Sequence, residues 1–305
     1  MNSLRITIFA SLTTALVCVA ATLLVLDRAG GARADSEACA RAAFGGRVSC
    51  LRSEATAMRR AHGTAAALAR LERLGRPDEC HLVGHDLGVA DAAAHSVLPS
   101  AGVTRHGLSQ CEQGYLHGVE LERVRAATTV GSLVALGRGS CGTPRRTSYL
   151  GGYDACIHGY GHAFVRLGGI DAAARGCAQL TPARARSGVR EECLYGAFME
   201  VALRAPPTTT SARMVAECER TAGTLATACW DYLPARLQFA AVAVREALTV
   251  CEQRAPVGAA RAACLATAIR GEDPSACGAL ATERAKTTCA DAARVDRALS
   301  RSGAA

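Results

Sequence analysis

Two pairs of histidines stand four residues apart in this sequence, His81 with His85 and His158 with His162. With 8 His in 305 positions, chance alone would give about 0.2 such pairs. On a helix, residues at this spacing project from one face, one turn apart. Two imidazoles in that arrangement can bind one metal ion, so the two pairs predict a metal centre carried by helices.

A further histidine, His117, stands at a related position in the chain. Three segments align on a cysteine that is followed, at the third position, by glycine: Cys111, Cys156 and Cys193. At the sixth position after the cysteine, these segments carry His117, His162 and Met199. The same helix position is therefore used repeatedly, and neighbouring helices could bring these side chains to one shared centre.

Two carboxylates share the spacing of the histidines. Asp154 lies four residues before His158, and Glu120 lies one helical turn beyond His117. Either could be a ligand or could fix the tautomer of an imidazole that is one. The candidate ligands are His81, His85, His117, His158, His162, Asp154, Met199 and Glu120. We interpret His62, His95 and His106 as structural or surface residues rather than ligands.

The residue types in this ligand set limit which metal ions we expect to bind. Imidazole suits zinc, copper, iron and nickel, and a neighbouring methionine favours copper, so we expect Cu, Fe or Zn. One arrangement places a first ion on His81, His85 and His117, and a second on His158, His162 and either Asp154 or Met199. A single ion, or a non-covalent haem with two axial histidines between glycine-lined helices, remains an alternative.

In ligand arrangement alone, the two H-x-x-x-H segments with an additional histidine resemble the coupled binuclear copper proteins that bind oxygen or oxidise phenols. The resemblance covers only the histidines of the two pairs and His117. It implies a pair of copper ions and a redox activity. Tyr115, Tyr160 and Tyr195 lie near these ligands in the sequence and would line the pocket of such an enzyme.

Several other classes of protein are excluded by residue type. A zinc peptidase of the H-E-x-x-H type needs glutamate after its first histidine, where this chain has Leu82 and Gly159. A Gly-x-Ser-x-Gly elbow is missing from the sequence, and the single lysine, Lys286, is far from any glycine-rich turn that could bind phosphate. A net charge of +8 with 4% aromatic residues argues against a nucleic-acid partner.

Three functions follow from the histidine pattern, and each predicts a different geometry. A copper- or iron-dependent oxidoreductase needs an open coordination position beside an accessible pocket. A metal or haem carrier without turnover needs a saturated or surface-exposed site. A helical scaffold that binds another protein would leave its histidines scattered, with side chains more than about 8 Å apart, far beyond a metal–nitrogen bond.

Cysteine spacing predicts how the fold is held together. After Cys18, fourteen cysteines remain, an even number that indicates seven disulfides in an oxidising compartment. We expect neighbours in the chain to pair: Cys39–Cys50, Cys80–Cys111, Cys141–Cys156, Cys177–Cys193, Cys218–Cys229, Cys251–Cys264 and Cys277–Cys289. The absence of any C-x-x-C argues against a zinc ribbon, a thioredoxin-type site and covalent haem.

The elements that must carry these residues are helices. The second cysteine of several pairs opens an apolar, alanine-rich stretch, which predicts a repeat of roughly 35 residues built from two helices and a turn. Period-2 runs are missing from the sequence, so strands are not expected. Residues 51–74 are predicted to form one long helix that ends at Gly75 and Pro77. The predicted fold is all-α, a disulfide-stapled helical repeat or bundle.

The N-terminus predicts the compartment. Ile6–Leu26 has no charge and, as a helix, would span roughly 31 Å, the thickness of a bilayer core. It is too long for the apolar part of a signal peptide, which favours an uncleaved transmembrane anchor, although Ala32-Arg33-Ala34 offers a cleavage site. Both alternatives place the rest of the chain outside the cytoplasm, at the cell surface or in the periplasm.

The distribution of histidine suggests three regions. Residues 1–34 are the signal anchor or signal peptide, and residues 35–207 form a His- and Cys-rich helical domain with the metal site. Residues 208–305 contain three cysteine pairs and no histidine, so this region is expected to support the first or to bind a protein partner. Pro206–Thr210 is the candidate linker.

Overall fold

The computed structural model describes residues 39, 44–94, 110–143, 152–181, 188–204, 209–240, 242–270 and 272–302. The chain divides into two units, 1–42 and 43–305, and of the first only Cys39 is described. The expected anchor at Ile6–Leu26 and its cleavage site lie outside the described residues. Within the described ranges, we find no helix that combines the length and the apolar character needed to cross a bilayer.

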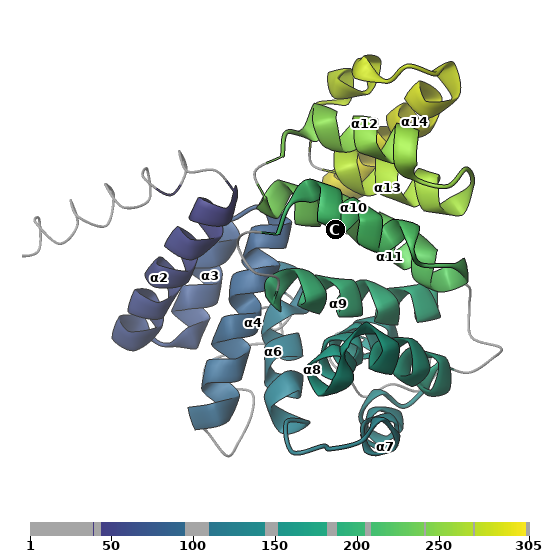
Figure 1. Cartoon of the computed structure of the whole chain (residues 1–305). Coiled ribbons are helices and arrows are strands. Elements are labelled where there is room, and N and C mark those ends of the chain that lie inside the picture. Colours follow the sequence, from purple (N-terminus) through teal and green to yellow (C-terminus); the bar gives the residue numbers. More distant parts are fainter. Residues whose placement is uncertain are drawn as a thin grey trace, which may run out of the picture. The chain divides into compact units, whose positions relative to one another are not determined.

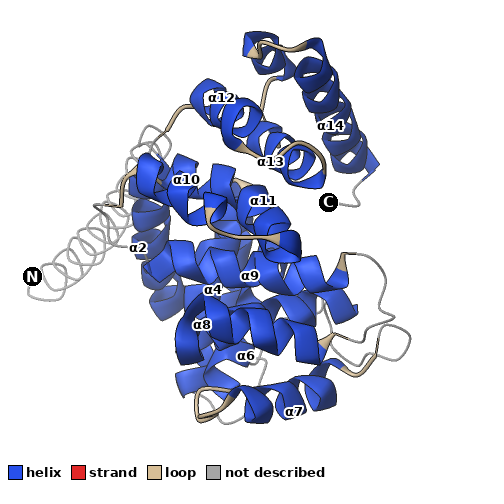
Figure 2. Ribbon diagram, turned by 45° about the vertical axis from the view of Figure 1, so that its right-hand side comes forward, coloured by secondary structure: helices blue, strands red, loops and turns tan. Residues whose placement is uncertain are grey.

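The described residues of the second unit form helices and no strand (Figure 2), which confirms the predicted all-α class. In chain order the helices are α2 (Phe44–His62), α3 (Thr64–Leu74), α4 (Pro77–Ala94), η1 (Gln110–Gln113), α6 (Gly114–Arg123), α7 (Val130–Cys141), α8 (Gly152–Leu180), α9 (Val189–Arg204), α10 (Ser211–Glu219), α11 (Gly223–Phe239), α12 (Val244–Arg254), α13 (Ala259–Ile269), η2 (Pro274–Ala279) and α14 (Glu283–Ser302).

The prediction of one helix over residues 51–74 is wrong. The segment forms two helices, α2 and α3, which meet at Gly63 and pack against each other. Gly63 has φ +85°, a left-handed conformation that only glycine adopts readily, so the helix cannot continue through it. The predicted stop at Gly75 is confirmed, because α3 ends one residue earlier, at Leu74.

Disulfides staple consecutive helices together, as the cysteine spacing predicted. The bonds are Cys80–Cys111, Cys141–Cys156, Cys177–Cys193, Cys218–Cys229, Cys251–Cys264 and Cys277–Cys289. Cys39 and Cys50 are also disulfide-bonded. Most of these bonds join the end of one helix to the first half of the next. In the chain-entropy model, closing a loop of about 15 residues stabilises the fold by on the order of 3 kcal/mol. This number of disulfides indicates an oxidising, extracytoplasmic environment.

Two close helix pairs form the centre of the second unit. Helix α4 packs along α6, α8 packs along α9, and α6 also touches α8 (Figure 1). Glycine permits the close approach in both pairs: a Cβ added to Gly118 would overlap the carbonyl oxygen of His85, and one added to Gly196 would overlap that of His158. The glycines that flank the histidines in sequence are therefore helix contacts, and they bring the helices that carry histidine together.

The C-terminal helices cover this centre from one side. Helix α11 packs against α9, and α10, α12 and α13 pack against α11, with α14 beyond them against α13. Trp230, Leu233 and Leu237 of α11 are fully buried. At about 25 cal/mol per Å² of apolar surface removed from water, such side chains contribute a large part of the packing energy of this region.

Candidate metal centre

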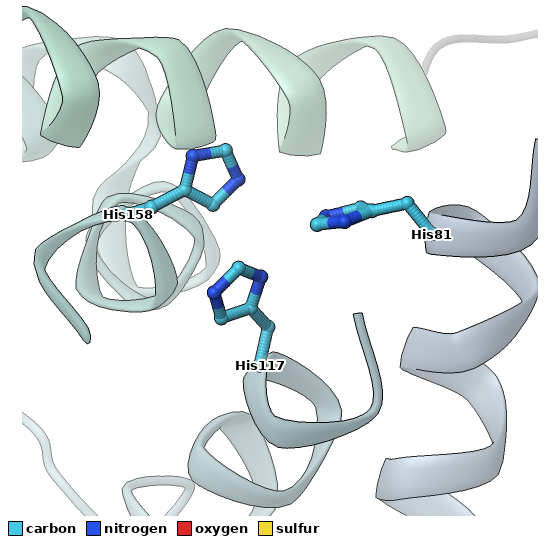
Figure 3. Close-up of side chains that lie close together, drawn as sticks. All are labelled: His81, His117 and His158. Carbon is cyan, nitrogen blue, oxygen red and sulfur yellow. The ribbon is translucent and has the colours of Figure 1, made fainter. Parts of the chain in front are cut away.

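Five imidazoles from three helices meet in the interior of the protein. His81 and His85 lie on α4, His117 on α6, and His158 and His162 on α8. Their rings are between 0% and 4% exposed, and the centroids of contacting rings are 4.5 to 6.3 Å apart. Figure 3 shows three of them, His81, His117 and His158, pointing toward one another from separate helices.

The ring nitrogens form two triads that could hold a metal ion. One triad is His81, His117 and His158, the other is His81, His85 and His162, and the nitrogens within each lie within 4.8 Å of one another. The Nε2 atoms of His81 and His85 are 3.0 Å apart, and those of His158 and His162 are 3.2 Å apart. Two nitrogens bound to one ion at about 2.0–2.1 Å would be separated by about 2.9–3.4 Å.

Three of the five imidazole rings have a hydrogen-bond partner at Nδ1, which we call the outer nitrogen. Nδ1 of His81 donates to the carbonyl oxygen of Cys111 at 3.1 Å. Nδ1 of His158 faces a carboxylate oxygen of Glu192 at 2.8 Å, and Nδ1 of His162 faces one of Glu200 at 3.1 Å. Carbonyl or carboxylate partners of this kind orient metal-binding imidazoles and fix the proton on the outer nitrogen.

The carboxylate of Glu192 is suited to accept a hydrogen bond from Nδ1 of His158. Burial alone would raise the pKa of Glu192, but the hydrogen bond from His158, the charge of His158 and that of Arg270 outweigh burial and lower the pKa. The carboxyl is therefore ionised at neutral pH. Glu200 is 2% exposed and also accepts from Arg166 Nε at 2.7 Å. Both glutamates are hydrogen-bond acceptors, so the His158 and His162 Nδ1 atoms carry the protons.

This proton arrangement leaves an electrostatic conflict between His158 and His162. A neutral imidazole protonated at Nδ1 has only a lone pair at Nε2. When both rings are neutral, two such lone pairs face each other at 3.2 Å. His81 and His85 avoid the conflict, because Nε2 of His85 can donate to Nε2 of His81. Between His158 and His162 only a cation, either a proton or a metal ion, removes the repulsion.

At His85, His117 and His162 the surroundings disfavour a bound proton. Burial, and then the neighbouring imidazoles, lower the pKa of His85, His117 and His162 well below 6.5. These rings are therefore neutral at pH 7, which is the form that binds metals without first losing a proton. A buried nitrogen without a partner costs free energy, and His85 Nδ1 and both nitrogens of His117 have no well-formed hydrogen bond. The carbonyl of Ala155 acts only weakly on His117, raising its pKa slightly against the dominant effect of burial.

The structure thus brings together the five predicted histidines, and it groups them differently from the two-ion arrangement expected from the sequence. Each triad combines rings from more than one chain segment, and both include His81. His62 is exposed, while residues 95 and 106 lie outside the described part of the chain. That the five rings are ligands stays a prediction.

The other three candidate ligands lie outside both triads. Glu120 is buried but accepts from the Tyr160 hydroxyl at 2.8 Å and from Arg123 at 3.2 Å. Asp154 and Met199 belong to neither of the groups of ring nitrogens found in the described residues.

The three tyrosines that were expected near the ligands have different surroundings. The Tyr115 hydroxyl donates to Asp91 at 3.1 Å, and that of Tyr160 donates to Glu120. The ring of Tyr195 packs on a histidine, with its centroid 5.8 Å from that of His158. That the three tyrosines line a pocket stays a prediction.

Glu192 is a functional candidate that the sequence pattern did not single out. It lies eight residues before Glu200, with Gly196 midway, so the three share one face of α9. That face lies against the α8 face of His158, His162 and Arg166, which have the same spacing. The matching i, i+4, i+8 spacing on the two segments was the signal that could have revealed it.

Comparison with known proteins adds no assignment: no family model, no curated protein and no solved structure matches the chain. The case for a metal centre comes from the chain's own geometry. Neutral, buried imidazoles with fixed outer protons and converging inner nitrogens can bind a metal ion, and their burial would limit exchange of that ion with solvent.

Proposed function

We propose that this protein binds a transition-metal ion through its five buried histidines and retains it, without turnover, in an oxidising compartment outside the cytoplasm. One observation carries the proposal. The Nε2 atoms of His158 and His162 are 3.2 Å apart, while their outer nitrogens are both committed to carboxylates. This pair needs a cation between its inner nitrogens when both rings are neutral, and each of the two rings also belongs to a triad with two other histidines.

A metal ion fits this centre better than haem does. The five ring centroids lie 4.5 to 6.3 Å from their neighbours, a spacing that suits ligands around a single ion. The backbones of α4 and α6, and those of α8 and α9, touch at glycine. A planar macrocycle would have to separate these helices, whereas an ion needs only the inner nitrogens.

Burial favours retention of the ion over catalysis. All five rings are at most 4% exposed, whereas an enzyme needs an open coordination position that substrate can reach. The scaffold alternative predicted side chains more than about 8 Å apart. The ring centroids, 4.5 to 6.3 Å apart, do not fit that geometry. The function that fits best is holding, delivery or sequestration of a metal.

A copper- or iron-dependent oxidoreductase is the second candidate, and one contact favours it. The ring of Tyr195 packs on that of His158, and Tyr232 packs edge-on against Tyr195 with centroids 4.9 Å apart. Such a row of aromatic rings could carry an electron from the centre. Turnover of a phenolic substrate by the metal-loaded protein would favour this candidate over the carrier.

The proposal keeps the two partners expected from the sequence. Residues 6–26 would anchor the chain in a membrane, and the helices of residues 208–305 would bind a protein partner. Fractionation of the full chain expressed in a bacterial host tests the first, because carbonate-washed membranes should retain an anchored protein and release a processed one.

Metal analysis tests the central proposal. The full chain is exported to an oxidising compartment, purified without chelator, and assayed for bound metals and haem before and after incubation with copper, zinc and iron salts. We expect about one equivalent of a transition metal to remain after gel filtration. Less than a tenth of an equivalent of every metal tested, both as isolated and after incubation, would overturn the proposal.

A variant pair separates binding from folding. His81→Ala combined with His158→Ala removes one nitrogen from each helix pair, so it should abolish metal binding and leave the far-ultraviolet circular dichroism unchanged. His62→Ala is the matched control, because His62 is exposed at the end of α2. If the double variant unfolds, metal binding is measured instead in the conservative variants His81→Gln and His158→Gln, each tested alone.

A further inference from the structure

The charges around the five rings nearly cancel before any ion binds. Two carboxylates touch the rings, Glu192 at His158 and Glu200 at His162. Each carboxylate is opposed by an arginine: Arg166 pairs with Glu200 at 2.7 Å, and Arg270 acts electrostatically on Glu192. Asp231 also interacts electrostatically with Glu192 and Arg270, and burial raises its pKa, which favours its uncharged form.

The nitrogens of the triads themselves bring no charge. An imidazole must be neutral to bind a metal ion, and both triads consist of histidine alone. An ion bound there would therefore keep its full charge in a site that is at most 4% exposed. The cost of removing an ion from water rises with the square of its charge, so a divalent ion pays about four times the penalty of a monovalent one of similar size.

The number of available nitrogens also suits an ion of low coordination number. His81 takes part in both triads, but its Nδ1 is occupied by the Cys111 carbonyl, so it can bind only one ion. An ion in either triad then has three nitrogens, and an ion between His158 and His162 alone has two. Cu(I), which has a filled d shell and no strong geometric preference, accepts two or three imidazoles.

We propose, on the basis of the metal-binding function above, that this centre selects copper in its singly charged state, Cu(I), over divalent ions. Imidazole is a good ligand for copper in general. Three features favour the ion of lower charge and so select the oxidation state. The ligands are neutral imidazoles, the carboxylates beside the rings are opposed by arginines, and the site is buried.

The reduction potential of the bound copper measures this selection directly. The full, disulfide-bonded chain is loaded with one equivalent of copper and titrated potentiometrically with mediators, one electron being added to each Cu(II) ion. We expect Cu(I) to bind at least about 100-fold more tightly than Cu(II). At 59 mV for each tenfold change, the potential would lie at least about 118 mV above that of the aqueous Cu(II)/Cu(I) couple.

A charge variant tests the physical cause. Arg166→Gln removes the positive charge opposite Glu200 and leaves one uncompensated carboxylate beside His162, which favours the divalent ion. Because Arg166 is 44% exposed, solvent screens part of its effect, and we expect the preference for Cu(I) to fall by about tenfold. Arg213→Gln on α10 is the matched control, since Arg213 pairs with a glutamate outside the centre.

The outcomes separate the two proposals. A raised potential that falls in Arg166→Gln and not in Arg213→Gln supports selection of Cu(I) by charge. Copper bound with a potential at or below that of the aqueous couple overturns this inference and leaves the metal-binding function standing. If neither Cu(I) nor any divalent ion is retained, the metal-binding function itself is wrong.

Discussion

Replacing Gly118 by alanine should disturb the centre from outside it. Gly118 follows His117 on α6, and its added Cβ would overlap the carbonyl oxygen of His85 and lie 2.9 Å from the backbone nitrogen of Val89. Ordinary contact begins at 3.4 Å, so α4 and α6 must separate by at least about 0.5 Å. Metal–ligand distances tolerate only about 0.2 Å. The substitution therefore moves His85 and His117 beyond the range of a good site.

The effect on stability has two opposing parts. Overpacking costs about 1–3 kcal/mol, while alanine is favoured over glycine in a helix by up to about 1 kcal/mol. We expect the free energy of unfolding of Gly118→Ala to fall by about 1–2 kcal/mol, as measured by chemical denaturation of the metal-free protein. Metal affinity, measured by competition with a chromophoric chelator, should fall at least tenfold.

A second glycine provides the control. Gly139 lies in the exposed face of α7, where an added Cβ meets nothing within 4 Å. Gly139→Ala should therefore keep full metal affinity and gain up to about 1 kcal/mol of stability. If Gly118→Ala is as stable as Gly139→Ala and binds metal equally well, then the close packing of α4 on α6 does not position the histidines, and the reasoning is refuted.

Two further predictions concern the glutamate behind His162 and the effect of pH. Glu200→Gln weakens the anchor of His162 and should lower metal affinity 10- to 100-fold, whereas the exposed Glu219→Gln should not; equal affinities would contradict the orienting role. Because burial and the neighbouring rings hold the pKa of His85, His117 and His162 below 6.5 in the fold, only the unfolded chain takes up protons as pH falls below about 6.5. The unfolding free energy of the metal-free protein should therefore decrease from pH 7.5 to pH 5.0, and a flat denaturation profile would show that these rings are not held neutral.

The helical class, the disulfide pairing and the five histidines could be predicted from the sequence, because each depends on local spacing. A histidine pair at i, i+4 shares a helix face wherever the helix lies. Cysteines at the ends of consecutive helices are close along the chain, so a short turn is enough to bring them together. The break at Gly63 was missed because its left-handed conformation is a property of the folded backbone.

The grouping of the rings and the role of Glu192 were decided only by the tertiary structure. Sequence neighbours suggested that His81, His85 and His117 share one ion, but the packing of α6 against α8 places His158 beside His81 and His117. The contact of α8 with α9 likewise turns Glu192 and Glu200 into acceptors for His158 and His162. Residue spacing determines which face of a helix a side chain occupies, whereas the packing of helices against one another determines what that face meets.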